Sequence, residues 1–348
     1  MDHRHVASRR SVLSSTREVP GHYLPVMLPP WRLKVGLALG GGAARGLAHI
    51  GVLRGLVREG IPIDIITGTS MGAVVGGAYA AMGDIAEIER RFRALLASDE
   101  FQRTRVSFLR ETKKTRGSLL YSVTSLVRRG IVYGVSTMRP SFVSAERFAI
   151  SLGRILPDVE VSTTPIRFAA SAVDLETAEE VVLCHGRLRE VAAASAAIPG
   201  ILPPRRMHGR LLIDGGWADK IPVLPAFRLG ADVVIGVDIS ADLAEVKRYA
   251  RGIDVVLRAN LIKDTVLTEF QRRLADVVIE PAVRKIHWAD FEAANYCIEA
   301  GDAAATQAVP KIRELLRQER FRSMVRPTLG KRMAERYLAS TDLKFTME

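Results

Sequence analysis

One serine lies at the junction between a short β-branched run and a glycine-spaced helical pattern. The run Ile63 to Thr67 ends at Gly68, and the helical pattern begins just after Ser70. The flanking glycines, Gly68 and Gly72, let the backbone turn sharply without a Cβ clash. A strand, a turn that carries a serine and a helix form a nucleophile elbow, and the helix N-terminus favours an anion beside the hydroxyl. The stretch therefore predicts a pre-aimed nucleophile at the end of a strand.

The same stretch has an alternative interpretation as a membrane helix. No residue from Ile65 to Gly83 is charged, and glycines recur at every fourth position, as they do in close-packed membrane helices. Five glycines leave the stretch poorly hydrophobic, however, and a β-type run precedes it. We therefore interpret the glycines as the helix face that presses against a sheet, and we expect any membrane contact to be peripheral.

A glycine-rich loop follows an earlier strand pattern. The run Leu33 to Leu39 reads as a buried strand, and helical spacing continues after the loop as far as Gly60. The loop between them is Gly40, Gly41, Gly42, Ala43, Ala44, Arg45 and Gly46. Such a loop presents backbone N–H groups to an anion. Two anions fit, a dinucleotide pyrophosphate or the oxyanion that forms when a serine attacks an ester.

The register of the loop weakens the nucleotide interpretation. Ala43 stands where the second glycine of a G-x-G-x-x-G motif is expected. Its N–H is still a donor, so an oxyanion hole survives this replacement, whereas the approach of a bulky pyrophosphate is hindered. The next strand pattern also ends at a nucleophile, Ser70, rather than at an acid that would bind a ribose.

A carboxylate ends a third strand pattern. The run Arg210 to Asp214 ends in this acid, and two glycines follow it. Because the carboxyl ends of the strands in an α/β sheet converge on one crevice, we expect Asp214 to lie near Ser70. Ser70 would attack an acyl carbon, and Asp214 would accept the hydroxyl proton. The oxyanion would be held by three backbone N–H groups, those of Gly41, Gly42 and Ala43.

The histidines do not indicate a conventional triad. Of seven, only His287 follows both Ser70 and Asp214, and it stands beside Trp288 without a turn signature. We therefore predict a Ser70–Asp214 dyad. An aspartate of ordinary pKa, about 3.9, is a weak base toward an alcohol, so Asp214 needs a dry pocket. Ser195, within an alanine-rich helix and without a glycine corner, is interpreted as a packing residue.

Helix and strand patterns alternate through the core, which favours an α/β fold with a mostly parallel sheet and helices on both faces. Residues 1–32 read as a basic, disordered arm, 33–316 as the catalytic domain and 317–348 as a basic, weakly held tail. Residues 101–130 form a strongly basic insertion within the domain. Two distant cysteines, Cys184 and Cys297, read as small buried residues and favour a reducing, cytoplasmic compartment.

The net charge of +12 predicts an attraction to anionic partners. The basic insertion reads as a solvated, mobile segment, as a lid, or as a contact with the inner face of an anionic membrane. The residues expected to make that contact are Arg103, Arg105, Arg110, Lys113, Lys114 and Arg116. No specific nucleic acid is expected.

The glycine loop, the Gly68 to Gly72 elbow and the Asp214-Gly215-Gly216 motif, in this order, resemble the patatin-like phospholipases. The bacterial branch related to the neuropathy target esterase catalytic domain is the nearest in pattern. The resemblance implies a three-layer α/β/α fold, a Ser70 nucleophile, an Asp214 partner and hydrolysis of lipid acyl esters without a metal or cofactor. The oxyanion loop would run from Gly41 to Ala43. Supporting roles are expected for Gly40, Arg45, Gly46, Gly68, Gly72, Gly215 and Gly216.

Two positions depart from the family pattern. Ala43 replaces a motif glycine, and Asp219 stands where many relatives carry Asn. We interpret Asp219 as a polar cap for the helix that begins at Pro222, with a second carboxylate acting beside Asp214 as the alternative. Two other functions stay open, a basic protein that binds membrane or nucleic acid without catalysis, and nucleotide binding through the glycine loop.

Overall fold

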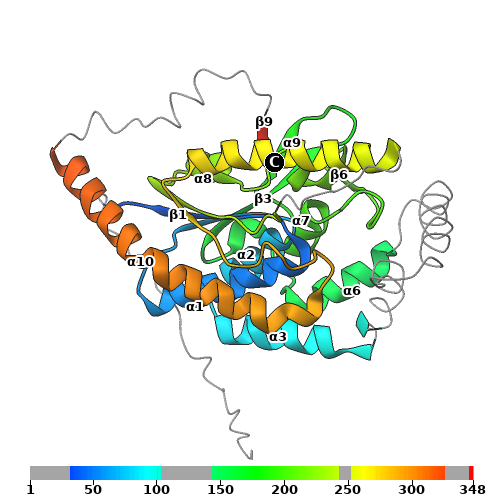
Figure 1. Cartoon of the computed structure of the whole chain (residues 1–348), viewed down its shortest axis with the longest axis horizontal. Helices are drawn as coiled ribbons and strands as arrows, with labels where there is room; N and C mark the ends of the chain where they lie inside the picture. Colours follow the sequence, from blue (N-terminus) through cyan, green and yellow to red (C-terminus); the bar gives the residue numbers. More distant parts are fainter. Residues whose placement is uncertain (1–31, 100, 103–142, 243–251, 326–344, 348) are drawn as a thin grey trace, which may run out of the picture. The chain divides into compact units, whose positions relative to one another are not determined.

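The computed structural model describes residues 32–99, 101–102, 143–242, 252–325 and 345–347 (Figure 1). The domain that these residues form begins at Leu33. Most of the predicted arm at 1–32, of the basic insertion at 101–130 and of the tail at 317–348 lies outside the described residues. The same holds for the six residues predicted to contact a membrane, Arg103, Arg105, Arg110, Lys113, Lys114 and Arg116.

The described residues form a nine-stranded mixed sheet with the path β5-β6-β3-β2-β1-β7-β8, and β4 lies between β3 and β9. The strands are β1 (Val35–Leu39), β2 (Ile65–Thr69), β3 (Arg167–Asp174), β4 (Glu180–Leu183), β5 (Arg205–Met207), β6 (Arg210–Asp214), β7 (Val233–Val237), β8 (Val277–Ile279) and β9 (Phe345–Met347). The central pairs, from β3 through β2 and β1 to β7 and β8, are parallel. The pairs β3–β4, β3–β6 and β5–β6 are antiparallel. The predicted mostly parallel α/β sheet is confirmed.

Helices cover both faces of this sheet. They are η1 (Ala43–Leu47), α1 (Ala48–Arg58), α2 (Met71–Met82), α3 (Ile85–Ala97), α6 (Ala145–Ile155), η2 (Val161–Thr163), α7 (Leu188–Ser195), η3 (Gly215–Trp217), α8 (Val223–Arg228), α9 (Gly252–Leu274), η4 (Phe291–Ala293) and α10 (Ala294–Val325). In Figure 1, α1, α2, α3 and α10 lie below the sheet, and α8 and α9 lie above it. The larger hydrophobic core lies between the sheet and the first group, and a smaller one lies under α8.

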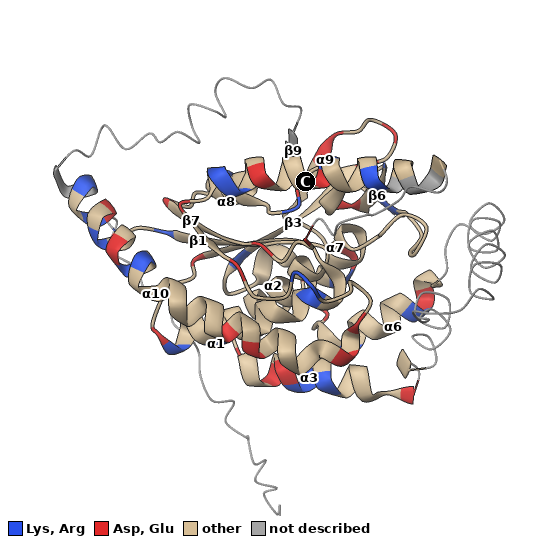
Figure 2. Ribbon diagram, in the orientation of Figure 1, with Lys and Arg blue, Asp and Glu red and all other residues tan. Residues whose placement is uncertain are grey.

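The uncharged stretch that could have been read as a membrane helix consists of the strand β2 and the buried helix α2. The helix α2 is the part that resembled a membrane span. It lies in the middle of the molecule and carries no charged side chain (Figure 2). A Cβ added at Gly76 would lie 2.8 Å from Ile66 and 3.0 Å from Leu39, two residues of the neighbouring strands. The predicted glycine face pressed against a sheet is therefore confirmed.

No helix in the described ranges combines the length and the apolar character needed to cross a bilayer.

Helix α10 continues to Val325, beyond residue 316 where the domain was predicted to end. The ion pairs Glu314–Arg317 and Glu319–Arg322 support these last turns. The strand β5 was not predicted. It forms a two-residue hairpin with β6 through His208 and Gly209, whose φ angles of +50° and +78° suit a type I′ turn.

The strand register places the ends of β2 and β6 side by side. β2 pairs with the first five residues of β3, and β6 pairs with the last three. β4 overlaps both of these ranges, so it occupies the opposite edge of β3. In this register, Thr69 is the partner of Ser171, and Asp214 is the partner of the next residue, Ala172. The residue that follows Thr69 is thereby brought next to Asp214.

Candidate active site

Ser70 occupies the sharp turn between β2 and α2. Its φ of +56° and ψ of −121° lie in a region that a residue with a Cβ rarely adopts. The side chain is buried, with 5% of its surface exposed. The turn is a strained elbow, as the glycine pattern around Ser70 predicted.

Ser195 at the end of α7 holds this elbow in its strained conformation. Its Oγ accepts a hydrogen bond from the Ser70 N–H at 3.0 Å and donates one to the Ser171 carbonyl at 2.7 Å. Without Ser195, both backbone groups would be buried and unpaired, at a cost of about 1–3 kcal/mol each. Ser195 therefore positions the elbow in addition to packing, a role that its sequence context did not indicate.

Asp214 lies beside the Ser70 hydroxyl, which favours the charged form of the carboxyl. The carboxylate accepts a hydrogen bond from the Gly216 N–H at 2.8 Å. Burial raises the pKa of Asp214 to about 6, and the Ser70 hydroxyl, the Gly216 N–H and the charge of Lys220 offset only part of this effect. The dry environment that a carboxylate base needs is present, and Asp214 is still ionised at neutral pH.

The glycine loop lies against the elbow. A Cβ added at Gly41 would lie 3.4 Å from the Ser70 Cβ. The Gly41 N–H, however, already donates to the Lys220 carbonyl at 2.9 Å, so it is not available as an oxyanion donor. No acceptor in the described part of the chain takes a hydrogen bond from the N–H of Gly42 or Ala43. Of the three N–H groups predicted to bind the oxyanion, those of Gly42 and Ala43 remain without an acceptor among the described residues.

Ala43 adopts a backbone conformation that favours glycine. Its φ is +48°, which costs a residue with a Cβ roughly 1–2 kcal/mol. The next residue, Ala44, donates its N–H to the Trp288 carbonyl at 2.8 Å, and this bond helps to hold the strained turn. The motif glycine is therefore replaced at a small cost in stability, and the N–H of Ala43 is retained.

Arg45 anchors the loop to two distant segments. Its guanidinium donates to the Ile239 carbonyl at 2.9 Å and to the Ile286 carbonyl at 3.1 Å. Burial lowers the pKa of this side chain, and the charge of Asp238 partly offsets the effect. Arg45, for which a supporting role was predicted, thus ties the glycine loop to the segments that follow β7 and β8.

His49 anchors the start of the loop from α1. Its Nε2 lies 2.7 Å from the Gly40 carbonyl, and the side chain is fully buried. Burial lowers the pKa of His49 to about 4, so the ring is neutral at physiological pH and Nε2–H donates to Gly40. Nothing in the local sequence pattern distinguishes this histidine from other residues of the first helix.

Several motif positions are glycine because a neighbouring backbone or side chain lies too close for a Cβ. A Cβ at Gly72 would lie 2.1 Å from the Leu39 carbonyl oxygen, and one at Gly215 would lie 2.3 Å from the Ser171 carbonyl oxygen. A Cβ at Gly46 would lie 2.3 Å from the Met71 Cγ. The three motifs can approach one another only with glycine at these points.

We expect Gly72→Ala to lower the free energy of unfolding by about 2–4 kcal/mol, because the added methyl group meets strand backbone that cannot rotate away. Gly153→Ala is the matched control, since Gly153 also lies in a helix but its Cβ would have only ordinary contacts at 3.7 Å and beyond. The control should raise stability by about 0.5–1 kcal/mol. Urea unfolding measures both, and equal effects of the two substitutions would contradict the close approach at Gly72.

Asp219 is not a helix cap. α8 has Pro222 at its N-cap position with no side-chain cap. The Asp219 carboxyl instead forms a hydrogen bond with Glu180, and burial together with this neighbour raises the pKa of Asp219 well above its ordinary value. Its backbone carbonyl accepts a bond from the Thr69 hydroxyl at 2.8 Å. The interpretation of Asp219 as a cap is wrong, because its carboxyl pairs with Glu180 of β4.

His287, which was not expected to complete a triad, bonds within its own segment. Its Nδ1 accepts a bond from the Ala289 N–H at 3.3 Å, and its ring lies against Trp288.

The two cysteines were expected to be small buried residues. Both are free, but only Cys297 is buried, and Cys184 is half-buried. Within the described ranges, no group of three or more His, Cys, Asp or Glu side chains is arranged to hold a metal ion.

Comparison with known proteins identifies the family. The family model described as patatin-like phospholipase matches residues 37–227, more than half of the chain. An uncharacterized NTE family protein of Mycobacterium tuberculosis is 35% identical over 62% of this chain and 52% of its own length. A lysophospholipase NTE1 of Scheffersomyces stipitis is 32% identical over 60% of this chain and 12% of its own length.

Among solved structures, VipD from Legionella pneumophila aligns with a TM-score of 0.39 at 13% identity, over 81% of this chain and 67% of its own.

The chain spans about half the length of the mycobacterial relative and about an eighth of the length of the yeast relative. The family match spans β1 to α8 and includes the glycine loop, the elbow and the Asp214 motif. The chain belongs to the patatin-like phospholipase family.

Proposed function

We propose that the protein hydrolyses carboxylic ester bonds of lipids, as a phospholipase A or lysophospholipase, with Ser70 as nucleophile and Asp214 as base. One observation carries the proposal. The Ser70 hydroxyl, on a strained elbow, lies beside a buried carboxylate whose pKa is raised to about 6. A nucleophile in contact with a base of suitable strength is the minimum that ester cleavage requires.

The proposed reaction has two halves. In the first, the Ser70 oxygen attacks the acyl carbon while Asp214 takes the hydroxyl proton. The tetrahedral oxyanion is held by the N–H groups of Gly42 and Ala43. The intermediate collapses to an acyl-serine, and the departing alcohol takes the proton from Asp214. In the second half, water gives a proton to Asp214 as its oxygen attacks the acyl-serine. The bond to Ser70 then breaks, and the Ser70 oxygen takes the proton back from Asp214, which releases the fatty acid and restores both residues.

Lipid esters are the substrate class that the relatives support. The matching family is described as patatin-like phospholipase, and the yeast relative is named a lysophospholipase. The nucleotide alternative is disfavoured because the Gly41 N–H is already bonded to Lys220, which leaves fewer donors for a pyrophosphate. We therefore retain lipid ester hydrolysis as the one proposed activity.

The direct test is to incubate the full chain with a mixed extract of phospholipids and lysophospholipids and to measure released fatty acids by mass spectrometry. We expect release that continues in the presence of EDTA, because no metal takes part in the proposed steps. Folded protein that releases no fatty acid from any lipid class would contradict the proposal.

Ser195→Ala tests the support of the elbow. The substitution leaves the Ser70 N–H and the Ser171 carbonyl without a partner, so the free energy of unfolding should fall by about 1–3 kcal/mol. Because the elbow would lose its alignment, kcat should fall about tenfold with little change in KM. Ser151→Ala is the control, since its exposed hydroxyl bonds only to the Arg147 carbonyl of the same helix. A loss of stability with unchanged kcat would limit Ser195 to packing.

A further inference from the structure

Helix α9 presents its polar side to the protein and an apolar side to solvent. Thr268 and Gln271 are buried, with 4% and 6% of their surfaces exposed, whereas Val266 on the opposite side is 66% exposed. A surface helix of a globular protein ordinarily has the reverse arrangement. The outward side of α9 therefore needs an explanation other than the stability of the fold.

The exposed apolar side chains form one stripe along the helix. Their spacing of three or four residues keeps them on a single face. The apolar stripe consists of Val255, Ala259, Ile262, Val266 and Phe270, all exposed. Continuous exposed apolar surface of this kind marks an interaction site, while single exposed apolar residues do not.

The inward face of α9 is fixed to the segment that follows Asp214. Gln271 Oε1 accepts bonds from the N–H groups of Lys220 and Ile221 at 3.0 and 3.1 Å, and its Nε2 donates to the Ala218 carbonyl at 2.9 Å. This segment connects the acid of the candidate dyad to α8. The apolar stripe is thus carried by a helix that is hydrogen-bonded to the segment between Asp214 and α8.

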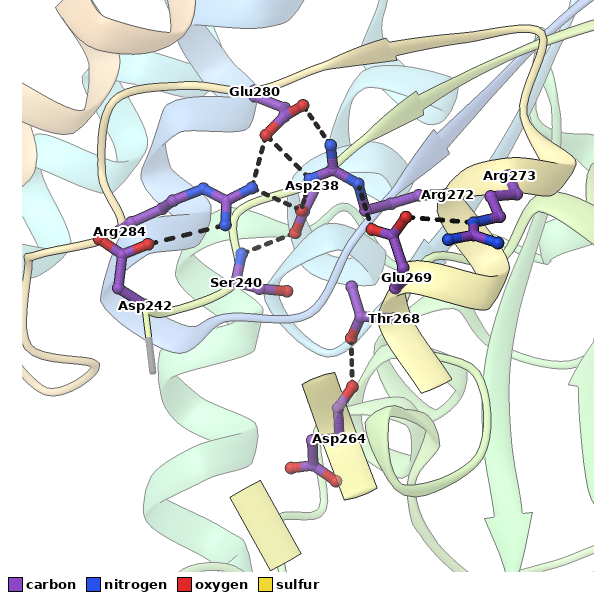
Figure 3. Close-up of polar contacts among 10 residues, drawn as sticks. All are labelled: Asp238, Ser240, Asp242, Asp264, Thr268, Glu269, Arg272, Arg273, Glu280 and Arg284. Atoms are coloured by element: carbon purple, nitrogen blue, oxygen red, sulfur yellow. Dashed lines mark hydrogen bonds and ion pairs between the residues drawn. The ribbon is translucent and has the colours of Figure 1, made fainter. Parts of the chain in front are cut away.

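A charged cluster fixes the C-terminal end of the same helix (Figure 3). Asp238, buried at the end of β7, accepts bonds from Arg272 of α9 at 2.6 Å and from Arg284 at 3.2 Å. Glu280 bridges the same two arginines. These ion pairs lie on the side of α9 that faces the protein. They therefore hold the helix in an orientation that keeps its apolar stripe outward.

An exposed tryptophan extends the apolar surface toward the site. Trp217 lies three residues after Asp214 and is 42% exposed. The Lys263 ammonium of α9 lies 4.9 Å from the centroid of its ring. Tryptophan and lysine together suit a boundary between apolar chains and anionic headgroups, since the ring has both apolar and polar character and the ammonium attracts phosphate.

We propose that the apolar stripe of α9, together with Trp217 and Lys263, docks the protein on the surface of an anionic phospholipid bilayer. This inference rests on the proposed function, because an enzyme that cleaves lipid esters must reach substrate held in an aggregate. A lipid surface accepts a single convex helix, whose apolar side chains enter it by about 5–10 Å. A stable protein interface needs about 20–30 residues a side, which five side chains and one ring do not supply.

The test is co-sedimentation of the full chain with vesicles of phosphatidylcholine and phosphatidylglycerol. Ser70→Ala is present in every protein, so that binding is measured without turnover. The double substitution Val266→Asp and Phe270→Asp should lower the partition coefficient about tenfold or more, because two apolar side chains become charged. Phe321→Asp on α10 is the matched control, since Phe321 is also an exposed aromatic, at 68%, and lies outside the stripe. It should bind as the parent does.

Activity assays with Ser70 restored separate this inference from the proposed function. The stripe variant should hydrolyse a soluble p-nitrophenyl butyrate within about twofold of the wild type, and its hydrolysis of vesicle lipid should fall in parallel with binding. Equal vesicle binding by stripe and control variants would overturn the docking surface. A second result would also overturn it: light scattering shows that the wild type is a dimer and that the stripe variant is a monomer, while vesicle binding is unchanged. Vesicle binding through the stripe without any ester hydrolysis would overturn the proposed activity alone.

Discussion

Replacing Ser70 by alanine is expected to lower kcat for a p-nitrophenyl acyl ester by about 10⁴-fold or more, because the acyl-serine can no longer form. The fold should be retained. Alanine keeps the backbone N–H that bonds to Ser195, and it has the same Cβ as serine in the turn at φ +56°. The free energy of unfolding should therefore change only by the hydroxyl's own interaction with Asp214, about 1 kcal/mol.

Steady-state kinetics and urea unfolding of the Ser70→Ala variant measure the two quantities. Ser151→Ala, which replaces a half-buried serine on α6, should leave both unchanged. Residual activity above about 1% in a preparation free of contaminating esterase would point to another nucleophile, because loss of a true nucleophile leaves far less.

Asp214→Asn is expected to have the second large effect, a fall in kcat of about 10³–10⁴-fold. The amide oxygen can still accept the Gly216 N–H bond, so the local geometry is preserved. The amide cannot accept a proton from Ser70, so the base is lost. The wild-type kcat/KM should rise with pH up to about 6 and level off above it, because Asp214 must be ionised to act and its pKa lies at about 6.

The same substitution should stabilise the folded protein at neutral pH. The pKa of Asp214 is raised by burial from 3.8 to about 6, so the folded state binds the proton more tightly than the unfolded state does. The favourable contribution of the protonated form is fully present below pH 3.8 and is lost as the pH rises through 6. At pH 8 the buried charge costs about 3 kcal/mol, at about 1.4 kcal/mol for each pKa unit.

Urea unfolding of Asp214→Asn and wild type across pH 4–8 measures this difference. The variant should be more stable by up to about 3 kcal/mol at pH 8, and the advantage should shrink toward pH 4. A variant that is less stable than the wild type at pH 8, or an advantage that does not depend on pH, would contradict a buried base held in its charged form. A kcat/KM that stays constant between pH 5 and 7 would do the same.

The sequence predicted the parts of the site that are local to one strand end. Each motif consists of a strand pattern followed directly by the functional residue, so Ser70 and Asp214 could be recognised one at a time. The strand order brings them together, since β2 and β6 pair with neighbouring residues of β3. The mostly parallel α/β architecture followed from the alternation of helix and strand patterns for the same local reason.

The contacts that the sequence could not reveal join residues far apart in the chain. The Gly41 N–H donates to the Lys220 carbonyl, and the Ser70 N–H donates to the Ser195 hydroxyl. The periodicity of the local sequence predicts neither hydrogen bond. The carboxyl partner of Asp219 is Glu180, on a strand that precedes it by 39 positions. The sequence also could not say which face of α9 would be buried, and the buried face is polar.

The most direct measurement is to label the folded protein with a fluorophosphonate probe and to map the adduct by peptide mass spectrometry. We expect one adduct per chain, on Ser70, absent in Ser70→Ala and formed far more slowly in Asp214→Asn. Folded, monodisperse protein that takes up no probe, or that carries it on a residue other than Ser70, would contradict it.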